Sequence, residues 1–227
     1  QASFAGCEYV SGTGLALDLS ENTYIPDDDA TLRCASNIPR INPFNFNSAI
    51  TARDADNVTV HNEEGHWLAG VAAEFNESSS FYVVDLGSGA SFLNDGMMTS
   101  GSRFGEAANF VNSASGRMSA SSLSALQVGA NSVIDNSGRI ANSSSNGLST
   151  PAAIYASDGS YVLNRDTGLI RASGQGVFLD SVGAVTTLIN NGRINLDSYN
   201  LSRSYPAAVR ATASIGDAEV LIENTGL

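Results

Sequence analysis

Both histidines of the chain stand in one short segment, His61 to His66, which reads His-Asn-Glu-Glu-Gly-His. Its imidazoles and carboxylates are ligand types that zinc and related divalent ions accept. Any Ser-His-Asp triad would also need one of these histidines, because the chain has no others. A simpler interpretation is that the segment is the solvated corner of a repeated turn, in which Asn62 and Gly65 have structural roles. We favour the turn and expect no catalytic residue, no metal ligand and no cofactor.

The basic residues offer a second kind of chemistry, recognition of anions. All 11 are arginine, against 23 acidic residues, and the net charge is -12. This balance disfavours nucleic acids and anionic membranes as partners. Arg117, Arg139 and Arg193 each follow a repeated glycine directly, so on a regular repeat they would form one row able to bind acidic glycans. The alternative is a solvent-facing position that merely tolerates arginine, because His66 and Met97 occupy the equivalent place in other repeats.

Polar segments between the apolar stretches are candidates for recognition. Segments 141–150 and 197–205 are rich in Ser and Asn, and the second contains Tyr199 and Tyr205. Tyr beside Ser and Asn is a composition typical of recognition surfaces, although such tyrosines can equally pack onto the protein. The predicted binding residues are Ser143, Ser144, Asn146, Tyr199, Asn200, Arg203 and Tyr205, together with Arg139 and Arg193.

A repeat that runs from about residue 57 to the end would position these candidates. Each repeat has an apolar strand end, then an Asn-bearing turn closed by Gly, and an apolar residue two places later. At a spacing of roughly 20 to 35 residues, such short strands are typical of a β-solenoid, in which each coil buries its apolar face against its neighbours. We expect the glycines to supply a positive φ, and Asn to tolerate left-handed geometry or to bond its own backbone. The glycines are Gly65, Gly96, Gly116, Gly138, Gly168, Gly192 and Gly226, and the apolar residues are Trp67, Met98, Met118, Ile140, Ile170 and Ile194.

A second type of strand, rich in small residues, lies between these turns. Ala152–Ala156 and Ala207–Ala211 are examples, and Gly-bearing turns such as Asp158-Gly159 follow some of these strands. One coil is then predicted to have three strands and three corners. The predicted fold class is all-β, a parallel β-helix over residues 57–227 preceded by an N-terminal cap at residues 1–56. No helix longer than a turn or two is expected, and no apolar stretch is long enough to span a membrane as a helix.

The predicted cap holds both cysteines, Cys7 and Cys34. In an oxidising compartment a bond between them would stabilise the fold by on the order of 3 kcal/mol. We favour this disulfide over two free thiols, and over zinc because no Cys/His quartet exists. The run Asp27–Asp29 could bind calcium, but adjacent aspartates of a strand point to opposite faces, so we favour a solvated loop.

The repeat resembles that of bacterial autotransporter passenger domains, secreted proteins with right-handed parallel β-helices. The resemblance covers about residues 57–227 and rests on turns such as Ile189–Ile194 and Ile134–Ile140, with the Ala-Ala-Ile/Val strands between them. It implies a right-handed β-helix that is exported through the periplasm and is displayed on the bacterial cell surface or secreted. It also implies a longer full-length chain with a C-terminal outer-membrane barrel, so we expect the sequence to be truncated at its C-terminal end.

Many passenger domains act as adhesins or self-association modules, and others carry enzymes. The sequence lacks the Gly-Asp-Ser-Gly and Gly-Asp-Ser-Leu motifs of the protease and esterase types, and the G-x-S-x-G elbow. We therefore predict a non-enzymatic surface module with loops at one corner that bind a host surface protein or glycan, or another copy of the protein on a neighbouring cell. The alternative is a polysaccharide-degrading or glycan-binding β-helix enzyme, which a cluster of charged residues on one face would favour.

Overall fold

The computed structural model describes residues 7–16, 24–35, 50–69, 82–121, 123–143, 151–197, 207–214 and 218–226. Within these residues the chain forms 24 strands in three sheets and no helix. None of the described segments is a helix able to cross a membrane. The sequence-based prediction of an all-β chain with parallel sheets is confirmed.

The strands fall into three sheets, which we number 1 to 3. Sheet 1 contains, in spatial order, β1 (Cys7–Ser11), β4 (Thr31–Cys34), β6 (Thr59–Asn62), β9 (Ser91–Asn94), β12 (Asn109–Asn112), β15 (Val133–Asn136), β18 (Tyr161–Asn164), β21 (Val185–Asn190) and β24 (Glu219–Asn224). Sheet 2 contains β7 (Trp67–Ala69), β10 (Met97–Thr99), β13 (Arg117–Ala120), β16 (Arg139–Asn142), β19 (Leu169–Ala172) and β22 (Arg193–Leu196). Sheet 3 contains β2 (Gly14–Ala16), β3 (Tyr24–Pro26), β5 (Ile50–Ala52), β8 (Tyr82–Leu86), β11 (Gly101–Phe104), β14 (Leu126–Val128), β17 (Ala152–Ala156), β20 (Gln175–Ser181) and β23 (Ala207–Ala213).

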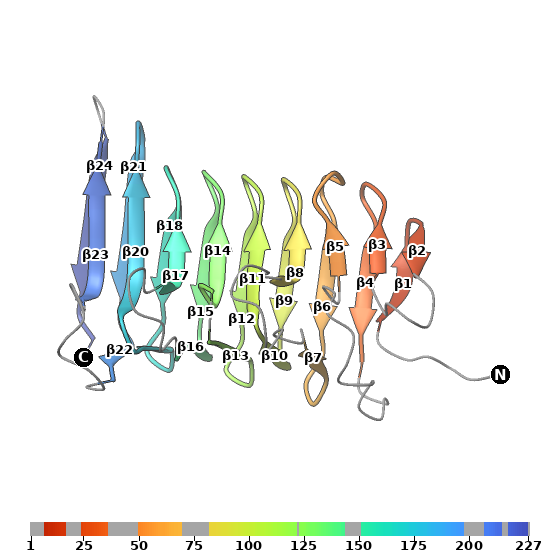
Figure 1. Ribbon diagram of the computed structural model, residues 1–227, viewed down its shortest axis with the longest axis horizontal. Coiled ribbons are helices and arrows are strands. Elements are labelled where there is room, and N and C mark those ends of the chain that lie inside the picture. Colours follow the sequence, from red (N-terminus) through yellow and green to blue (C-terminus); the bar gives the residue numbers. More distant parts are fainter. Residues whose placement is uncertain are drawn as a thin grey trace.

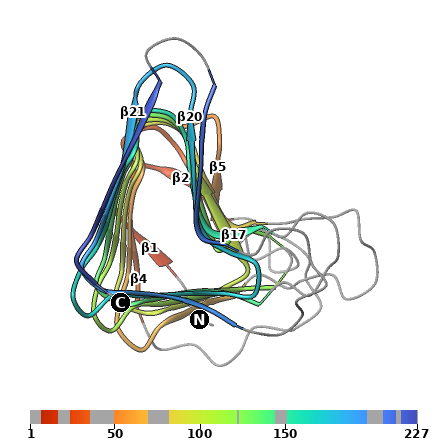
Figure 2. The same cartoon turned by 90° about the vertical axis from the view of Figure 1, so that its left-hand side faces the viewer.

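From β6 onward the chain visits sheets 1, 2 and 3 in that order and then begins again. Each strand therefore pairs in parallel with the strand three places later, and Figure 1 shows the strands side by side along the long axis. Viewed along that axis, the sheets make three walls that meet at three corners (Figure 2). We call one passage through the three sheets a coil. Because parallel strands cannot be joined by a tight hairpin, this path places every connection at a corner.

The N-terminal strands pair differently. β1 runs antiparallel to β4, and β2 runs antiparallel to β3. Parallel pairing begins where β3 meets β5 and β4 meets β6. The domain boundary predicted between residues 56 and 57 stays a prediction.

Alternate side chains of each strand point inward and form rows along the long axis. In sheet 1 one such row is fully or almost fully buried from Leu32 through to Leu188. The rings of Phe92, Phe104 and Phe110 pack together in this core, with centroids 5.4–5.7 Å apart. Each such side chain stabilises the fold by about 1.5–3 kcal/mol relative to exposure, so every coil depends on the next one to cover its row.

The inward row of sheet 2 differs from the prediction at its first position. Met98 pairs in register with Leu68, while Met97 pairs with Trp67. Leu68 is buried and Trp67 is 45% exposed, so placing Trp67 in the apolar row was wrong. The cause is one additional residue between Gly65 and the strand, which shifts the alternation of side chains by one place.

The repeated glycines stack at the corner between sheets 1 and 2, but a positive φ explains only Gly65. The others are required because the neighbouring coil approaches closely. A Cβ at Gly96 would lie 2.5 Å from the carbonyl oxygens of Glu63 and His66, and one at Gly138 would collide with the carbonyl oxygens of Ser113 and Gly116. The positive-φ explanation was therefore wrong for these glycines, which make room for the stacked backbone.

Left-handed geometry instead recurs at the corner between sheets 3 and 1. One residue in each connection from the β3–β4 turn to the β17–β18 turn has φ between 54° and 68°, and the N–H of the first five donates to the neighbouring coil at 2.8–3.0 Å. Only two of these residues are glycine. The stacked residues are Asp29, Asn57, Gly89, Ala107, Asn131 and Gly159.

Candidate functional site

The corner between sheets 1 and 2 contains a continuous column of asparagine side chains. Each strand of sheet 1 from β6 to β24 ends in Asn, and these residues pair in register. The Nδ2 of each donates to the Oδ1 of the next at 2.6–2.8 Å, and all but the last are buried. We call it the asparagine column: Asn62, Asn94, Asn112, Asn136, Asn164, Asn190 and Asn224.

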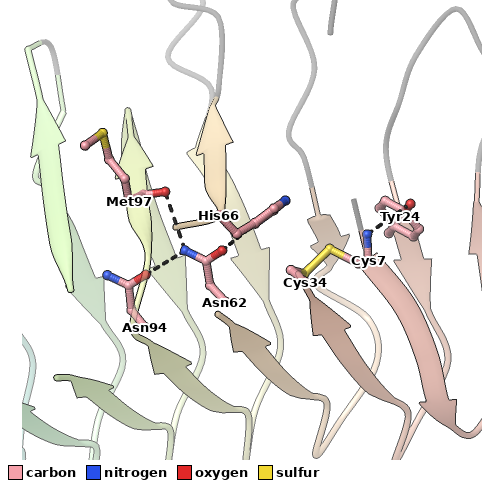
Figure 3. The surroundings of a disulfide bond; sticks show 7 residues. All are labelled: Cys7, Tyr24, Cys34, Asn62, His66, Asn94 and Met97. Carbon is pink, nitrogen blue, oxygen red and sulfur yellow. Dashed lines mark hydrogen bonds between the residues drawn. A yellow bond between two sulfur atoms is a disulfide. The ribbon is translucent and has the colours of Figure 1, made fainter. Parts of the chain in front are cut away.

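His66 closes the first end of this column. Its Nδ1 lies 2.6 Å from the Oδ1 of Asn62, whose Nδ2 is already committed to Asn94 and to the carbonyl of Met97 (Figure 3). His66 Nδ1 must therefore carry the proton and donate it. Burial lowers the pKa of His66, and the charge of Glu63 opposes this by a smaller amount, so the imidazole is neutral at pH 7.

The predicted disulfide between Cys7 and Cys34 is confirmed, and it lies in line with the asparagine column (Figure 3). Cys34 pairs in register with Asn62, and Cys7 pairs with Cys34. The Cys7 N–H also donates to the hydroxyl of Tyr24 at 3.2 Å. Where the parallel stacking meets the antiparallel N-terminal strands, a disulfide thus takes the place of the hydrogen bonds between Asn side chains.

The histidine segment does not form a converging set of ligands. His61 Nε2 contacts Asp95 Oδ2 at 2.7 Å on the outside of the protein, whereas His66 is buried in the corner. Across the described ranges, no three His, Cys, Asp or Glu side chains gather as metal ligands would. The aspartates considered for calcium take part in the turn before β4, where Asp28 accepts from the Asp56 N–H at 2.8 Å.

Most of the predicted binding residues fall outside the described part of the chain. These are Ser144, Asn146, Tyr199, Asn200, Arg203 and Tyr205. Ser143 is exposed directly after β16, where its N–H donates to the Ala120 carbonyl at 2.8 Å. Arg139 and Arg193 begin β16 and β22, so they lie at the opposite end of their strands from the connections to sheet 3.

The outer face of sheet 2 presents Arg139 and Arg193 in one row. The row runs Trp67, Met97, Arg117, Arg139, Leu169 and Arg193, each in register with the next. Arg117 and Arg139 are direct neighbours, and Leu169 separates Arg139 from Arg193. The expected row of arginines therefore exists, with one apolar interruption.

The outer face of sheet 3 has a different character, because its polar groups satisfy one another. Arg103 donates to both oxygens of Asp85 at 2.9 and 2.5 Å and lies over the ring of Tyr82. The Tyr155 hydroxyl donates to Asp180 at 2.7 Å, and burial together with this contact raises its pKa to about 12. This face therefore offers few unpaired groups to a ligand.

Comparisons with known protein families, with curated proteins and with solved structures find no match to this chain. Its function must therefore be inferred from the repeat and the surfaces described above.

The recurring Asn was expected either to tolerate left-handed geometry or to bond its own backbone. The second role is confirmed at Asn112 and Asn164, which donate to the carbonyl of the glycine that closes their own turn at 3.4 and 3.3 Å. The bonds between coils were not predicted. A signal for the column was present, because every Asn of the column stands two places after an apolar residue and is followed by a turn. The role of His66 is harder to see. The four-residue turns 113–116 and 165–168 end in Gly, and His66 holds that last place in the turn 63–66.

Proposed function

We propose that the chain is a right-handed parallel β-helix of the kind found in bacterial autotransporter passenger domains, and that it acts as a non-enzymatic adhesin or self-association module. The cyclic order of the three sheets and the buried asparagine column support the solenoid. The disulfide supports export into an oxidising compartment. The proposed location is the bacterial cell surface or the medium, reached through the periplasm, with an outer-membrane barrel in the full-length chain.

The distribution of connection lengths carries the functional part of the proposal. Between sheets 1 and 2 the turns are short, for example 95–96, 137–138 and 191–192. Between sheets 2 and 3 the connections range from a single residue at 100 to the segments 70–81, 143–151 and 197–206. Variable insertions on one edge of a repeat are typical of a binding edge, because a solenoid tolerates them without disturbing its stacking.

Binding without turnover fits the charged groups that the structure describes. Glycoside hydrolysis requires two carboxylates flanking the bond, yet the strands of sheet 2 contain no Asp or Glu. The carboxylates of sheet 3 are engaged: Asp85 with Arg103, and Asp180 with Tyr155 and Thr212. The proposed partner is a host surface protein or glycan, or a second copy on a neighbouring cell.

Bacteria that display this chain provide the test. Replacing segments 143–151 and 197–206 with two-residue connections should abolish attachment and cell–cell aggregation, because the binding edge is removed. Asp166→Asn, an exposed change at the corner between sheets 1 and 2, is the control and should leave both unchanged. Wild-type aggregation and attachment by the shortened protein, or release of sugars from a polysaccharide by the purified chain, would refute the proposal.

A further inference from the structure

Arginines are scarce in this acidic chain, and most of those described have a partner. Arg117, Arg139 and Arg193 are the exceptions: within the described residues none has an ion pair or an aromatic ring beside it. The partnered ones are Arg33 with Glu63, Arg53 and Arg103 with Asp85, Arg165 with Asp135, Arg171 with Asp197, and Arg210 over the ring of Phe178.

The three arginines without a partner share one row on the outer face of sheet 2. Arg117 and Arg139 are register partners on adjacent strands, about 4.8 Å apart along the row. Arg193 stands two strands beyond Arg139, at roughly twice that spacing. Arg117 and Arg193 are exposed, Arg139 is half-buried, and the next outward residue of β13 is the small, exposed Ser119.

Placing like charges opposite each other destabilises a sheet. Nothing in the described fold compensates Arg117 and Arg139, although the chain carries 23 acidic residues that could have been placed beside them. The sheet 2 strands carry no carboxylate at all. An arrangement that weakens the fold and leaves forked hydrogen-bond donors free indicates an anionic ligand supplied from outside.

We propose that this row binds a linear anionic polysaccharide through its carboxylate or sulfate groups. The inference rests on the proposed function, in which the chain binds and does not turn over its partner. Arginine suits this role because its planar fork can bind two oxygens of one acidic group. At one end of the row Trp67, 45% exposed, adds an aromatic surface against which a sugar ring can pack.

A nucleic acid fits the row less well. Duplex DNA carries one charge per 1.7 Å or so, and a net charge of -12 would repel so dense an anion. A polysaccharide with one acidic group every one or two sugars matches three cations spaced along a flat sheet.

Calorimetry on the purified chain tests the proposal with three polymers: κ-carrageenan for sulfate, polygalacturonate for carboxylate and dextran as the neutral control. κ-Carrageenan, polygalacturonate or both should bind, and dextran should not; which one binds identifies the acidic group. The triple variant Arg117→Gln, Arg139→Gln, Arg193→Gln should lose at least about tenfold in affinity. Its thermal unfolding should be unchanged or slightly improved, because the change removes repulsion between neighbours.

The matched control changes the net charge by the same amount elsewhere: Arg33→Gln, Arg53→Gln, Arg165→Gln. It should keep its affinity within about threefold, since exposed ion pairs contribute little to folding and these residues lie off the row. Equal losses in both triple variants, no binding of either acidic polymer, or single-stranded DNA bound as tightly would overturn the inference. Cell attachment is measured separately. A chain that still mediates attachment but binds neither polymer would refute the polysaccharide site and leave the proposed adhesin function standing.

Discussion

Two corners of the same coil differ in how constant their residues and connection lengths are. Where sheet 1 turns into sheet 2, each coil from β6 to β21 contributes one buried Asn, the turns have two or four residues, and each ends in a glycine or in His66. Where sheet 2 turns into sheet 3, the connection ranges from one residue to a segment such as 70–81. The first corner has a buried amide in almost every coil. At the second corner the described residues include one buried Asn, Asn142, which donates to the carbonyl of Leu123.

Sequence variation is tolerated unequally around such a coil. A buried amide must find its partner in the coils above and below, so the asparagine column fixes both residue type and register. The connections between sheets 2 and 3 differ in length from coil to coil, as surface connections do. We therefore expect a substitution in the asparagine column to reduce stability more than a change of connection length at the second corner.

The largest effect is expected in the middle of the asparagine column. Asn112→Ala leaves the Nδ2 of Asn94 and the Oδ1 of Asn136 buried without their partner. Two such groups should reduce the free energy of unfolding by about 3 kcal/mol. Urea unfolding measures it, with Asn109→Ala on the same strand as control, because Asn109 is exposed and should change stability by less than about 0.5 kcal/mol. Equal effects of the two substitutions would remove the distinction between the corners.

A smaller effect is expected from the stacked glycines. Gly138→Ala would push a Cβ into the carbonyl oxygens of Ser113 and Gly116, and should destabilise by about 2 kcal/mol. The control is Gly183→Ala in the turn between sheets 3 and 1, where the nearest atom lies 3.9 Å away. That change should be neutral or slightly stabilising. A Gly138→Ala protein as stable as Gly183→Ala would show that close stacking does not require glycine.

The smallest effect concerns His66, and it depends on pH. Because its pKa is lower in the folded protein than the usual 6.5, stability is complete above about pH 6.5 and falls as the pH drops from there through the folded pKa. Over that range His66 binds a proton in the unfolded chain but stays neutral when it is buried in the folded protein. Urea midpoints at pH 7.5 and pH 5.0 should differ more for the parent than for His66→Asn, whose amide can donate to Asn62 but does not titrate. His61 is present in both proteins, so an identical pH dependence would contradict the role given to His66.

The parts of the fold that follow from strand periodicity could be predicted from the sequence. Apolar residues at fixed distances from the turns indicated parallel strands, and paired cysteines in a separate segment indicated the disulfide. Residue type at the turns was visible as well, but its cause was not. Asn and Gly favour turns for several reasons, and only the packing of neighbouring coils shows that Asn112 bonds along a column and that Gly138 avoids a clash.

Other features depend on tertiary register and could not be predicted. The insertion of one residue before Trp67 reverses which side chain points inward, and no local pattern reveals it. The positive φ of Ala107 is imposed by stacking, because alanine has no intrinsic preference for that geometry. For the candidate site, the arginine row was recognisable from spacing. That Arg117 has no ion-pair partner among the described residues could be learned only from the positions of the carboxylates in the fold.

The two corners can be compared directly within a single coil: we expect the asparagine column to hold the stack and the connection to sheet 3 to tolerate a change of length. β15 ends in Asn136, and the connection 143–151 follows β16 in the same coil. Thermal unfolding should show that Asn136→Ala lowers the melting temperature by about 6 to 12 °C, as expected for a loss of about 3 kcal/mol in a chain of this size. Shortening 143–151 to two residues should shift it by less than about 2 °C. An unchanged melting temperature for Asn136→Ala, together with a large decrease for the protein with the shortened connection, would contradict this expectation.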